Sequence, residues 1–288
     1  MRVITYQTEG FEGKQAVALL KHYGCSGRII SKLKNGDNLQ INGKKARTID
    51  ILQEGDIVQI TLDDEKTLLP NPDLEVEIAF EDSDLVVFNK PANMATHPSI
   101  YHYRDTLGNF FAAKYPDCSF RAINRLDRNT SGLCLVAKNQ LAAANLSFAV
   151  NNHPDKVYYA VVCGRIADKG EIIAPIGRVD NSIIKREISE NGMFAHTVYE
   201  PICGNEEYTY VRVLLKTGRT HQIRVHFSHI VHPLAGDDLY GDNVKDIGRQ
   251  ALHCGEISFI HPTTRQPVII KAEPPEDMQR LIDIIKGE

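Results

Sequence analysis

The residues with the clearest chemical potential lie in the segment AINRLDRNTSGLCLVAKN, positions 122–139. Asp127 stands between Arg125 and Arg128, and nearby positive charge favours the ionised form of a carboxyl group. The residues 130–132, Thr-Ser-Gly, then turn into an apolar strand, and a turn beside a strand end can aim a side chain into a cleft. The segment predicts a working carboxylate, although a surface ion pair is the commoner arrangement on physical grounds alone.

A second polar cluster contains four histidines: His221, His226, His229 and His232. Histidines at helical spacing can bind zinc, but these do not follow the H-E-x-x-H pattern and no acidic residue lies among them. We therefore predict hydrogen-bonding and packing roles for them, and no metal site. Six cysteines are scattered without a C-x-x-C pair, which argues against a zinc ribbon or a disulfide scaffold. They are Cys25, Cys118, Cys134, Cys163, Cys203 and Cys254.

The elements around these residues predict an α+β fold. Strand patterns occur in VEIAF, DLVVFNK, GLCLVAK, KVYYAVV and YTYVRVLLK, and they alternate irregularly with helical patterns at 140–150 and 277–286. Irregular alternation favours an α+β domain over a doubly wound parallel sheet.

The first 62 residues predict a smaller unit. A strand at VITY is followed by two helical patterns, one at 14–23 and one with Ile29, Ile30 and Leu33 on one face. Strands at 39–41 and 57–60 flank an Asn42-Gly43 pair, which favours a hairpin-type reversal. The proline-containing stretch at 63–74 has no clear period and predicts a linker to a domain at 75–288.

Charge is distributed unevenly along the chain. The whole 288-residue chain carries a net charge of −4, but positions 14–47 hold eight Lys or Arg against a single acid, Asp37, so this segment is +7 and the remainder is −11. A local excess of this kind suits a phosphate-facing surface as well as it suits an ordinary solvated face. The hydrophobic content of 42% is that of an ordinary globular protein. The start of the chain lacks a signal-peptide pattern and no apolar run is long enough to span a membrane, so we expect a cytoplasmic protein.

The segment NRLDRNTSGL resembles the R-L-D-x-x-T-S-G-L signature of the RluA-type pseudouridine synthases, which include enzymes of large-subunit ribosomal RNA. The resemblance covers about 75–285 and extends to EDSDLVVFNKPANMATHPS, KVYYAVVCG, KTGRTHQIRVHFSHIVHPLAGDDLYG and RQALHCGEISFIHPTTRQP. It implies a pseudouridine synthase domain with a mixed, mainly antiparallel central sheet flanked by helices and a central cleft. Four ordered blocks make a chance match very improbable.

The resemblance also implies roles for individual residues. Asp127 matches the essential carboxylate, and Tyr158 in the K-x-Y block matches a tyrosine that stacks on the target base. Arg224 matches the arginine that pairs with the catalytic aspartate, and a guanidinium suits that task better than lysine. Leu252 matches a hydrophobic residue beside the active site, although plain core packing would also explain a leucine. Arg125 matches an arginine that can fill the space left by the flipped base.

Two positions depart from the commonest family pattern. Asn124 stands where histidine often precedes R-L-D, and Asn129 stands where aspartate is frequent. Neither replaces a residue essential to the chemistry, but both leave substrate choice open.

The N-terminal unit resembles the alpha-L RNA-binding module of ribosomal protein S-four type; the alternative is a small capping domain. Its basic residues are the expected RNA contacts: Lys14, Arg28, Lys32, Lys34, Lys44, Lys45 and Arg47.

These features predict an RNA pseudouridine synthase that uses an aspartate and no cofactor. The reaction detaches uracil from C1′ and rejoins it through C5 without a change in redox state, and the sequence has no P-loop or dinucleotide fingerprint. The expected partner is RNA, ribosomal RNA rather than transfer RNA, bound by a monomer with no obligate protein partner and no membrane. The alternatives are a non-catalytic RNA-binding or RNA-folding paralogue and, much less probable, a metal-dependent hydrolase that uses the histidines.

Overall fold

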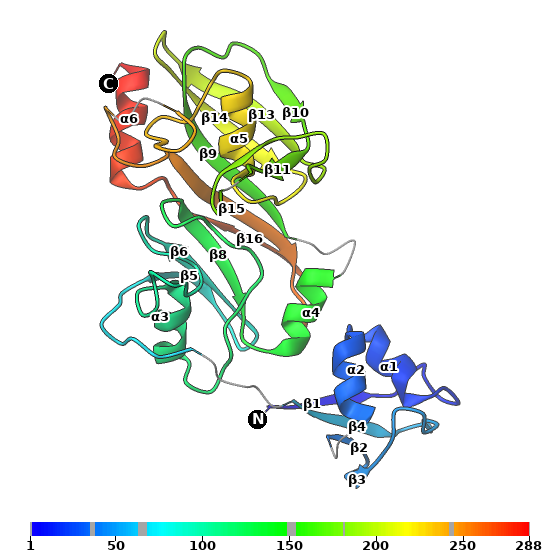
Figure 1. The fold of residues 1–288 in the computed structure, drawn as a ribbon. Coiled ribbons are helices and arrows are strands. Elements are labelled where there is room, and N and C mark those ends of the chain that lie inside the picture. The colour runs from blue at the N-terminus through cyan, green and yellow to red at the C-terminus, as the bar shows by residue number, and fades with distance from the viewer. Residues whose placement is uncertain are drawn as a thin grey trace.

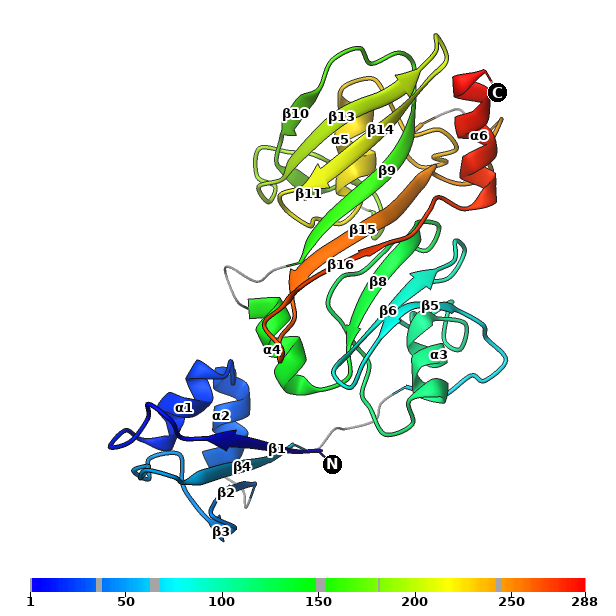
Figure 2. The same cartoon turned by 180° about the vertical axis from the view of Figure 1, so that it is seen from behind.

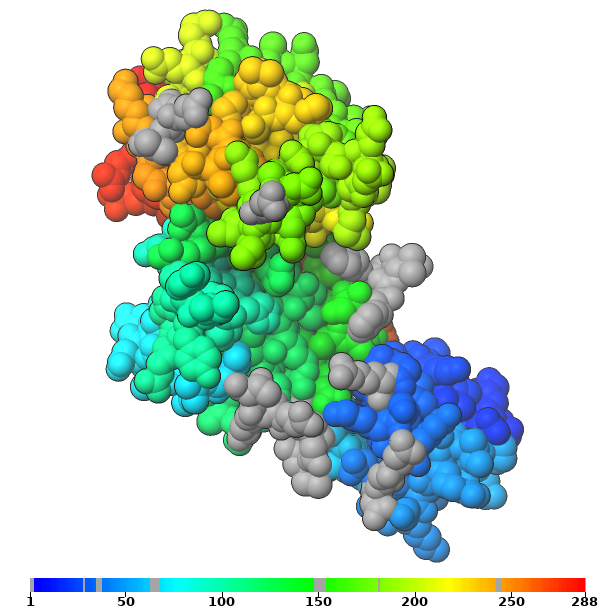
Figure 3. Space-filling view, viewed as in Figure 1, coloured from blue at the N-terminus to red at the C-terminus, as the bar shows by residue number. Residues whose placement is uncertain are grey.

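The computed structural model describes residues 2–34, 38–62, 68–148, 154–180, 182–241 and 245–287. It has a small N-terminal unit beside a larger part that is built on one long sheet (Figure 1). Figure 3 shows the N-terminal unit, in blue, as a lobe next to the larger part. None of the helices in these ranges is long and apolar enough to cross a membrane.

The N-terminal unit packs two helices on a four-stranded antiparallel sheet of order β1-β4-β2-β3. Its elements are β1 (Arg2–Gln7), α1 (Ala16–His22), α2 (Gly27–Lys34), β2 (Leu39–Ile41), β3 (Lys44–Lys45) and β4 (Ile57–Leu62). Leu19, Leu20, Leu33 and Ile60 are among the side chains of its buried core. The predicted second helix and strand at 39–41 are confirmed, and the first helix is two residues shorter at its start than the pattern predicted.

The predicted reversal at Asn42-Gly43 is present, but its partner strands differ from the prediction. Asn42 has φ 54° and Gly43 has φ 73°, the left-handed conformations that a two-residue hairpin turn requires. The turn joins β2 to the two-residue strand β3, and β4 pairs with the other edge of β2. The short β3 was not visible in the sequence because two lysines carry no strand signal.

The larger part is a ten-stranded sheet of order β10-β13-β14-β9-β15-β8-β6-β5, to which β16 and β7 add at β15 and β8. Among the described residues, β8 and β15 are the parallel pair and the other pairings are antiparallel, which confirms the predicted α+β fold with a mixed, mainly antiparallel sheet. The strands are β5 (Glu77–Glu81), β6 (Leu85–Lys90), β7 (Arg121–Ala122), β8 (Ser131–Ala137), β9 (Asp155–Cys163), β10 (Gly170–Ile173), β13 (His196–Gly204), β14 (Tyr208–Leu215), β15 (Leu252–Ile260) and β16 (Pro267–Lys271).

Among the described residues, four helices and one small hairpin complete this part: α3 (Leu107–Lys114), α4 (Gln140–Phe148), α5 (Gln222–His229), α6 (Glu276–Lys286), and the hairpin β11 (Ile176–Arg178) with β12 (Arg186–Ile188). Helix α5 lies against one face of the strands β13 and β14, whose other face is turned to the viewer in Figure 2. The predicted helices at 140–150 and 277–286 are α4 and α6, and residues 149–150 lie outside the described ranges.

The parallel pair of β8 and β15 joins the two halves of the long sheet. It consists of the partners Ser131 with His253 and Gly132 with Cys254. Gly132 has φ 110°, and a Cβ atom there would lie 2.3 Å from the carbonyl oxygen of Cys254. Only glycine fits this close approach, which explains the glycine of the Thr-Ser-Gly sequence.

One set of contacts joins the N-terminal unit to α4, and another joins the end of the predicted linker to α3. The core of the N-terminal unit includes Ala144 of α4, and Asn145 Nδ2 donates to the Tyr23 carbonyl at 3.3 Å. Residues 63–67 of the predicted linker lie outside the described ranges, but Asn109 Nδ2 of α3 donates to the Leu69 carbonyl at 2.7 Å. The last part of the predicted linker is therefore attached to α3.

Candidate active site

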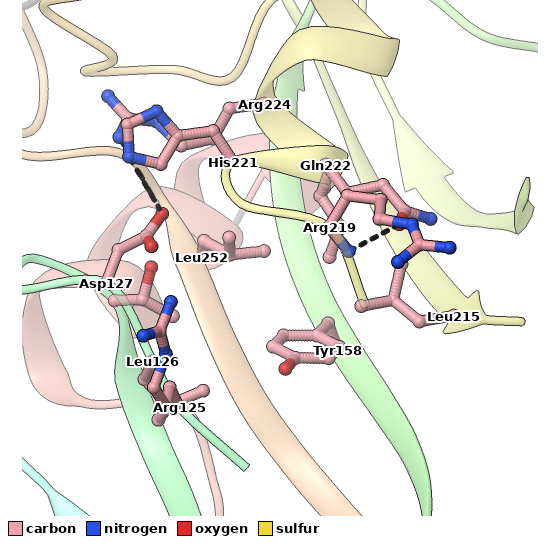
Figure 4. A pocket seen from close by; sticks show the side chains of 12 residues that line it. Arg125, Leu126, Asp127, Tyr158, Leu215, Arg219, His221, Gln222, Arg224 and Leu252 are labelled. Carbon is pink, nitrogen blue, oxygen red and sulfur yellow. Dashed lines mark hydrogen bonds and ion pairs between the residues drawn. The ribbon is translucent and has the colours of Figure 1, made fainter. Parts of the chain in front are cut away.

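Asp127 lies in a turn between β7 and β8. The turn comes just before Ser131, the first residue of β8, which pairs with His253 of β15. The Thr130 N–H donates to the Asp127 carbonyl at 3.1 Å and closes this turn, residues 127–130, which we call the catalytic turn. The Asp127 side chain is 31% exposed, and its Oδ2 is 3.8 Å from Arg224 Nη1 and 3.8 Å from His221 Nε2. Two groups that can carry positive charge therefore face one accessible carboxylate (Figure 4).

Arg224 is held mainly by a second carboxylate, that of Asp237. Its Nε and Nη2 donate to the two oxygens of Asp237 at 2.7 Å each, and the Asp237 side chain is fully buried. Burial alone would lower the pKa of Arg224, but the hydrogen bond and charge of Asp237, together with Asp127, raise it above its ordinary value. The predicted pairing of Arg224 with Asp127 is thus a longer, one-atom contact, while the guanidinium fork binds Asp237.

His221 stands at the start of α5 in the left-handed conformation, with φ 57°, which is uncommon for any residue except glycine. Its Nδ1 lies 2.9 Å from the Tyr240 hydroxyl, which also accepts the Arg186 N–H at 2.8 Å. Burial lowers the pKa of His221 more than the charge of Asp127 raises it, so the neutral ring is favoured. The tautomer that fits these partners carries its proton on Nε2, facing Asp127.

Tyr158 and Leu252 form the apolar side of the same pocket. They come from the neighbouring strands β9 and β15, where Tyr158 pairs with Cys254 and Leu252 with Ala160. Figure 4 shows the Tyr158 ring across the pocket from Asp127, with Leu252 between them. Burial raises the pKa of Tyr158 well above its ordinary value, so the phenol stays neutral and presents a flat, uncharged face.

The pocket opens into a cleft of about 980 Å³. Its lining carries five basic side chains against two acidic ones, Asp127 and Asp155; the basic ones are Arg125, Arg128, Lys156, Lys216 and Arg219. Arg125 is exposed at this wall. An excess of positive charge along a cleft suits a polyanionic substrate.

The structure accounts for Asn124, one of the two positions that depart from the family pattern. The Asn124 side chain donates to the Leu133 carbonyl at 3.1 Å and accepts the Leu135 N–H at 2.8 Å. It therefore completes the backbone hydrogen bonding of β8 at the lining of the cleft. The other position, Asn129, contributes its backbone carbonyl to a contact with Arg249 at 3.1 Å.

The remaining histidines of the cluster have separate partners. His226 bridges Thr197 Oγ1 and the Ala174 carbonyl at 2.9 Å each, His232 Nδ1 contacts the Cys163 carbonyl at 2.8 Å, and His229 is exposed. Among the residues that the structure describes, no three His, Cys, Asp or Glu side chains come together as a set of metal ligands.

The predicted RNA-binding residues of the N-terminal unit are exposed and lie apart from the cleft lining. They are Lys14, Lys32, Lys34, Lys44, Lys45 and Arg47; the side chain of Arg28 is outside the described part of the chain.

Three residues of the site were missed from the sequence. Asp237 and Tyr240 lie in the quoted block that also contains Arg224, but Asp237 and its neighbour Asp238 look alike in sequence, although the first is buried and the second is 75% exposed. Lys90 is fully buried and donates to the carbonyls of Met94 and Arg128 at 2.7 and 3.2 Å. In the sequence, Lys90 lies in the NKPANM run, within a segment that pointed only to the family resemblance and to no single residue.

Known proteins resemble this chain over most of its length. Residues 84–229 match the family model described as RNA pseudouridylate synthase. The Bacillus subtilis (strain 168) protein YjbO, described as an uncharacterized RNA pseudouridine synthase, is 42% identical over 275 residues, which are 92% of this chain and 96% of that protein. The ribosomal large subunit pseudouridine synthase D of Xanthomonas campestris is 33% identical, over 91% of this chain and 85% of that protein.

Two solved structures share the fold of this chain. The structure of human RNA pseudouridylate synthase domain containing 1 superposes with a TM-score of 0.58 at 24% identity, over 74% of this chain and 96% of that one. That of human RNA pseudouridylate synthase domain containing 4 gives 0.57 at 21% identity, over 73% and 92%.

Proposed function

Since this chain belongs to the RNA pseudouridylate synthase family, we propose that it isomerises uridines of large-subunit ribosomal RNA with Asp127 as its catalytic carboxylate. The single observation that carries the role of Asp127 is its position. It is an accessible carboxylate at the wall of the pocket, with Arg224 and His221 on one side and Tyr158 across from it.

The chemistry asks for a carboxylate of this kind. The bond from C1′ to N1 breaks, the uracil turns, a bond from C1′ to C5 forms, and the C5 hydrogen leaves as a proton while N1 gains one. As in glycoside cleavage, loss of the base builds positive charge on the sugar, which an ionised carboxylate stabilises or captures. Arg224 Nη1 and His221 Nε2 each lie 3.8 Å from Asp127 Oδ2, beside the carboxylate that would meet this charge. Atoms and oxidation state balance without an added reactant, so we propose that the reaction uses no cofactor.

The target nucleotide must leave its RNA stack to reach this pocket, at a cost of about a few kcal/mol. We propose that Tyr158 stacks on the extruded uracil, because its neutral ring forms the wall opposite Asp127. Leu252 packs beside the base from the next strand. The exposed Arg125 at the cleft wall fills the space that the base vacates.

We propose that the N-terminal unit, residues 1–62, is an RNA-binding module of ribosomal protein S-four type. Its exposed lysines and arginine supply a second basic surface apart from the cleft lining, and each neutralised phosphate releases counterions and so adds to affinity. Ribosomal RNA is proposed as the substrate because relatives such as the Xanthomonas campestris protein are described as ribosomal large subunit pseudouridine synthases. The predictions of a monomer, of no obligate protein partner and of a cytoplasmic location stay predictions.

The test is pseudouridine mapping at base resolution on total RNA from cells that lack this gene, complemented by wild type or by Asp127→Asn. We expect sites in large-subunit ribosomal RNA to disappear on deletion and to return only with wild type. Sites that return with Asp127→Asn would refute the role of Asp127. Sites confined to transfer RNA would refute the substrate class and leave the role of Asp127 intact.

A further inference from the structure

The catalytic turn is closed by its own backbone hydrogen bond, and side chains from other elements also hold it. Lys90 Nζ donates to the Arg128 carbonyl at 3.2 Å, and Gln250 Nε2 donates to Thr130 Oγ1 at 3.3 Å. A third donor, Arg249, reaches the carbonyl of Asn129 between them. The direction of the Asp127 side chain therefore depends on groups that are distant in the sequence.

Arg249 joins the catalytic turn to another wall of the pocket. Its Nη1 lies 3.1 Å from the carbonyl oxygen of Asn129, 3.1 Å from that of Gln250 and 3.4 Å from that of Leu252. Leu252 lines the pocket beside Asp127. One buried guanidinium thus sets the distance between the turn that carries Asp127 and the strand that carries Leu252.

The other edge of the same guanidinium is held by the C-terminal helix. Nε and Nη2 of Arg249 donate to the two oxygens of Asp277 at 2.6 and 2.9 Å. Asp277 is the second residue of α6, where a carboxylate also interacts favourably with the helix dipole. The Arg249 side chain is 8% exposed, and a buried guanidinium without its partner would carry an uncompensated charge. The two-point contact therefore orients Nη1 toward the turn.

We infer that Arg249 is a positioning residue for the reaction, which sets the direction of Asp127 through the carbonyls of Asn129 and Leu252, and that Asp277 orients Arg249. The inference rests on the proposed role of Asp127. Lysine cannot take over this task, because one ammonium group cannot keep a two-point contact with Asp277 and also reach the carbonyls. A small misplacement of a reacting group is enough to cost about a hundredfold in rate.

The experiment compares Arg249→Met, Arg249→Lys and Asp277→Asn with a matched control, Arg280→Met. Arg280 lies on the same helix and pairs with Glu276 at 3.0 Å, but both side chains are largely exposed. The rate is measured under single-turnover conditions as tritium release from a transcript that carries the uridine mapped in cells, labelled at C5. RNA affinity and urea unfolding are measured for each variant, at a temperature where it is fully folded.

We expect folded Arg249→Met to turn over about a hundredfold more slowly, with RNA affinity within about threefold of wild type. Asp277→Asn should be about tenfold slow and should add nothing in the Arg249→Met background, because it acts through the same group. Arg249→Lys should recover no more than about a tenth of the wild-type rate, and Arg280→Met should match wild type.

A residue that serves only the fold would leave the rate of folded molecules unchanged, so a folded Arg249→Met variant within about threefold of the wild-type rate overturns the inference. If this variant does not fold, wild-type rates in both Arg249→Lys and Asp277→Asn overturn it instead. Asp127→Asn is measured in the same assay. Turnover by Asp127→Asn would show that the proposed role of Asp127 has failed, whereas an inactive Asp127→Asn beside an active Arg249→Met would show that only the present inference has failed.

Discussion

The two adjacent carboxylates Asp237 and Asp238 allow a matched test of how Arg224 is held. Both lie near its guanidinium, but Asp237 is buried and contacts two nitrogens at 2.7 Å, whereas Asp238 is 75% exposed and lies 3.7 Å away. Changing either to asparagine removes one negative charge with almost no change in volume. The two variants therefore differ in burial and hydrogen bonding, and not in net charge.

The contacts of Asp237 determine how large the effects of Asp237→Asn on stability and rate should be. Asp237 Oδ1 also accepts the N–H groups of Leu239 and Tyr240 at 3.0 and 3.1 Å, so an asparagine keeps its oxygen there and turns its NH₂ toward Arg224 Nε. Donor then faces donor, and breaking a buried pair in this way costs about 3–5 kcal/mol of unfolding free energy. If about 3 kcal/mol of the loss also falls on the transition state, the rate drops about a hundredfold. For Asp238→Asn we expect less than about 1 kcal/mol.

The measurements are urea unfolding and single-turnover tritium release from RNA labelled at uridine C5. An Asp237→Asn variant that lies within about 1 kcal/mol of wild type in stability and within about twofold in rate would refute the reasoning. So would equal losses in the two variants, because burial would then not decide how strongly each carboxylate holds Arg224.

Three further predictions concern other parts of the molecule. Gly132→Ala should lower the free energy of unfolding by more than about 2 kcal/mol in urea titrations, since its Cβ would lie 2.3 Å from the Cys254 carbonyl oxygen at a φ of 110°; a smaller loss would show that β8 and β15 can separate freely. Burial lowers the pKa of Lys90 to about 7 from its ordinary value of 10.5, so the unfolded chain binds more protons between these values and stability should rise with pH across this window. Unfolding at pH 7 and pH 9.5 tests this, and a rise of the same size in Lys90→Met would assign it to other groups. Replacing Lys44, Lys45 and Arg47 by glutamine should reduce the slope of log affinity against log salt by about 2–3; an unchanged slope in binding titrations would count against an RNA contact by the N-terminal unit.

Strands β5, β6, β8, β9 and β14 could be predicted because their apolar runs are long and bounded by turn residues. The other strands of the same sheet, β7, β10, β13, β15 and β16, were not predicted. The helices α3 and α5 were not predicted. Helix α5 has eight residues, of which the polar Gln222, Arg224 and His226 are buried, so its sequence shows no alternation between an apolar and a polar face. Its start at His221 uses a left-handed conformation and no side-chain cap, which removes the usual start signal.

Residues of the candidate site could be named from the sequence where they belong to a motif. Partners that come together only through tertiary contacts could not be named in this way. The resemblance named Asp127, Tyr158 and Leu252 as site residues, and the structure brings these three to one pocket. The partner of Arg224 was only half predicted, because sequence cannot show which of two neighbouring aspartates is buried. Arg249 and Asp277 are 28 residues apart in the chain, and no local pattern connects them.

The length of strand β8 has a further consequence. The strand is buried along all seven residues, with the catalytic turn at its start and α4, which contacts the N-terminal unit, just after its end. At about 3.3 Å per residue it spans about 23 Å. If the N-terminal unit binds RNA as proposed, the length of this internal strand sets how far the reacting nucleotide lies from the RNA bound there. An RNA with the right local loop but its second contact at another spacing would then have to bend to be modified, so this length would contribute to the choice of substrate.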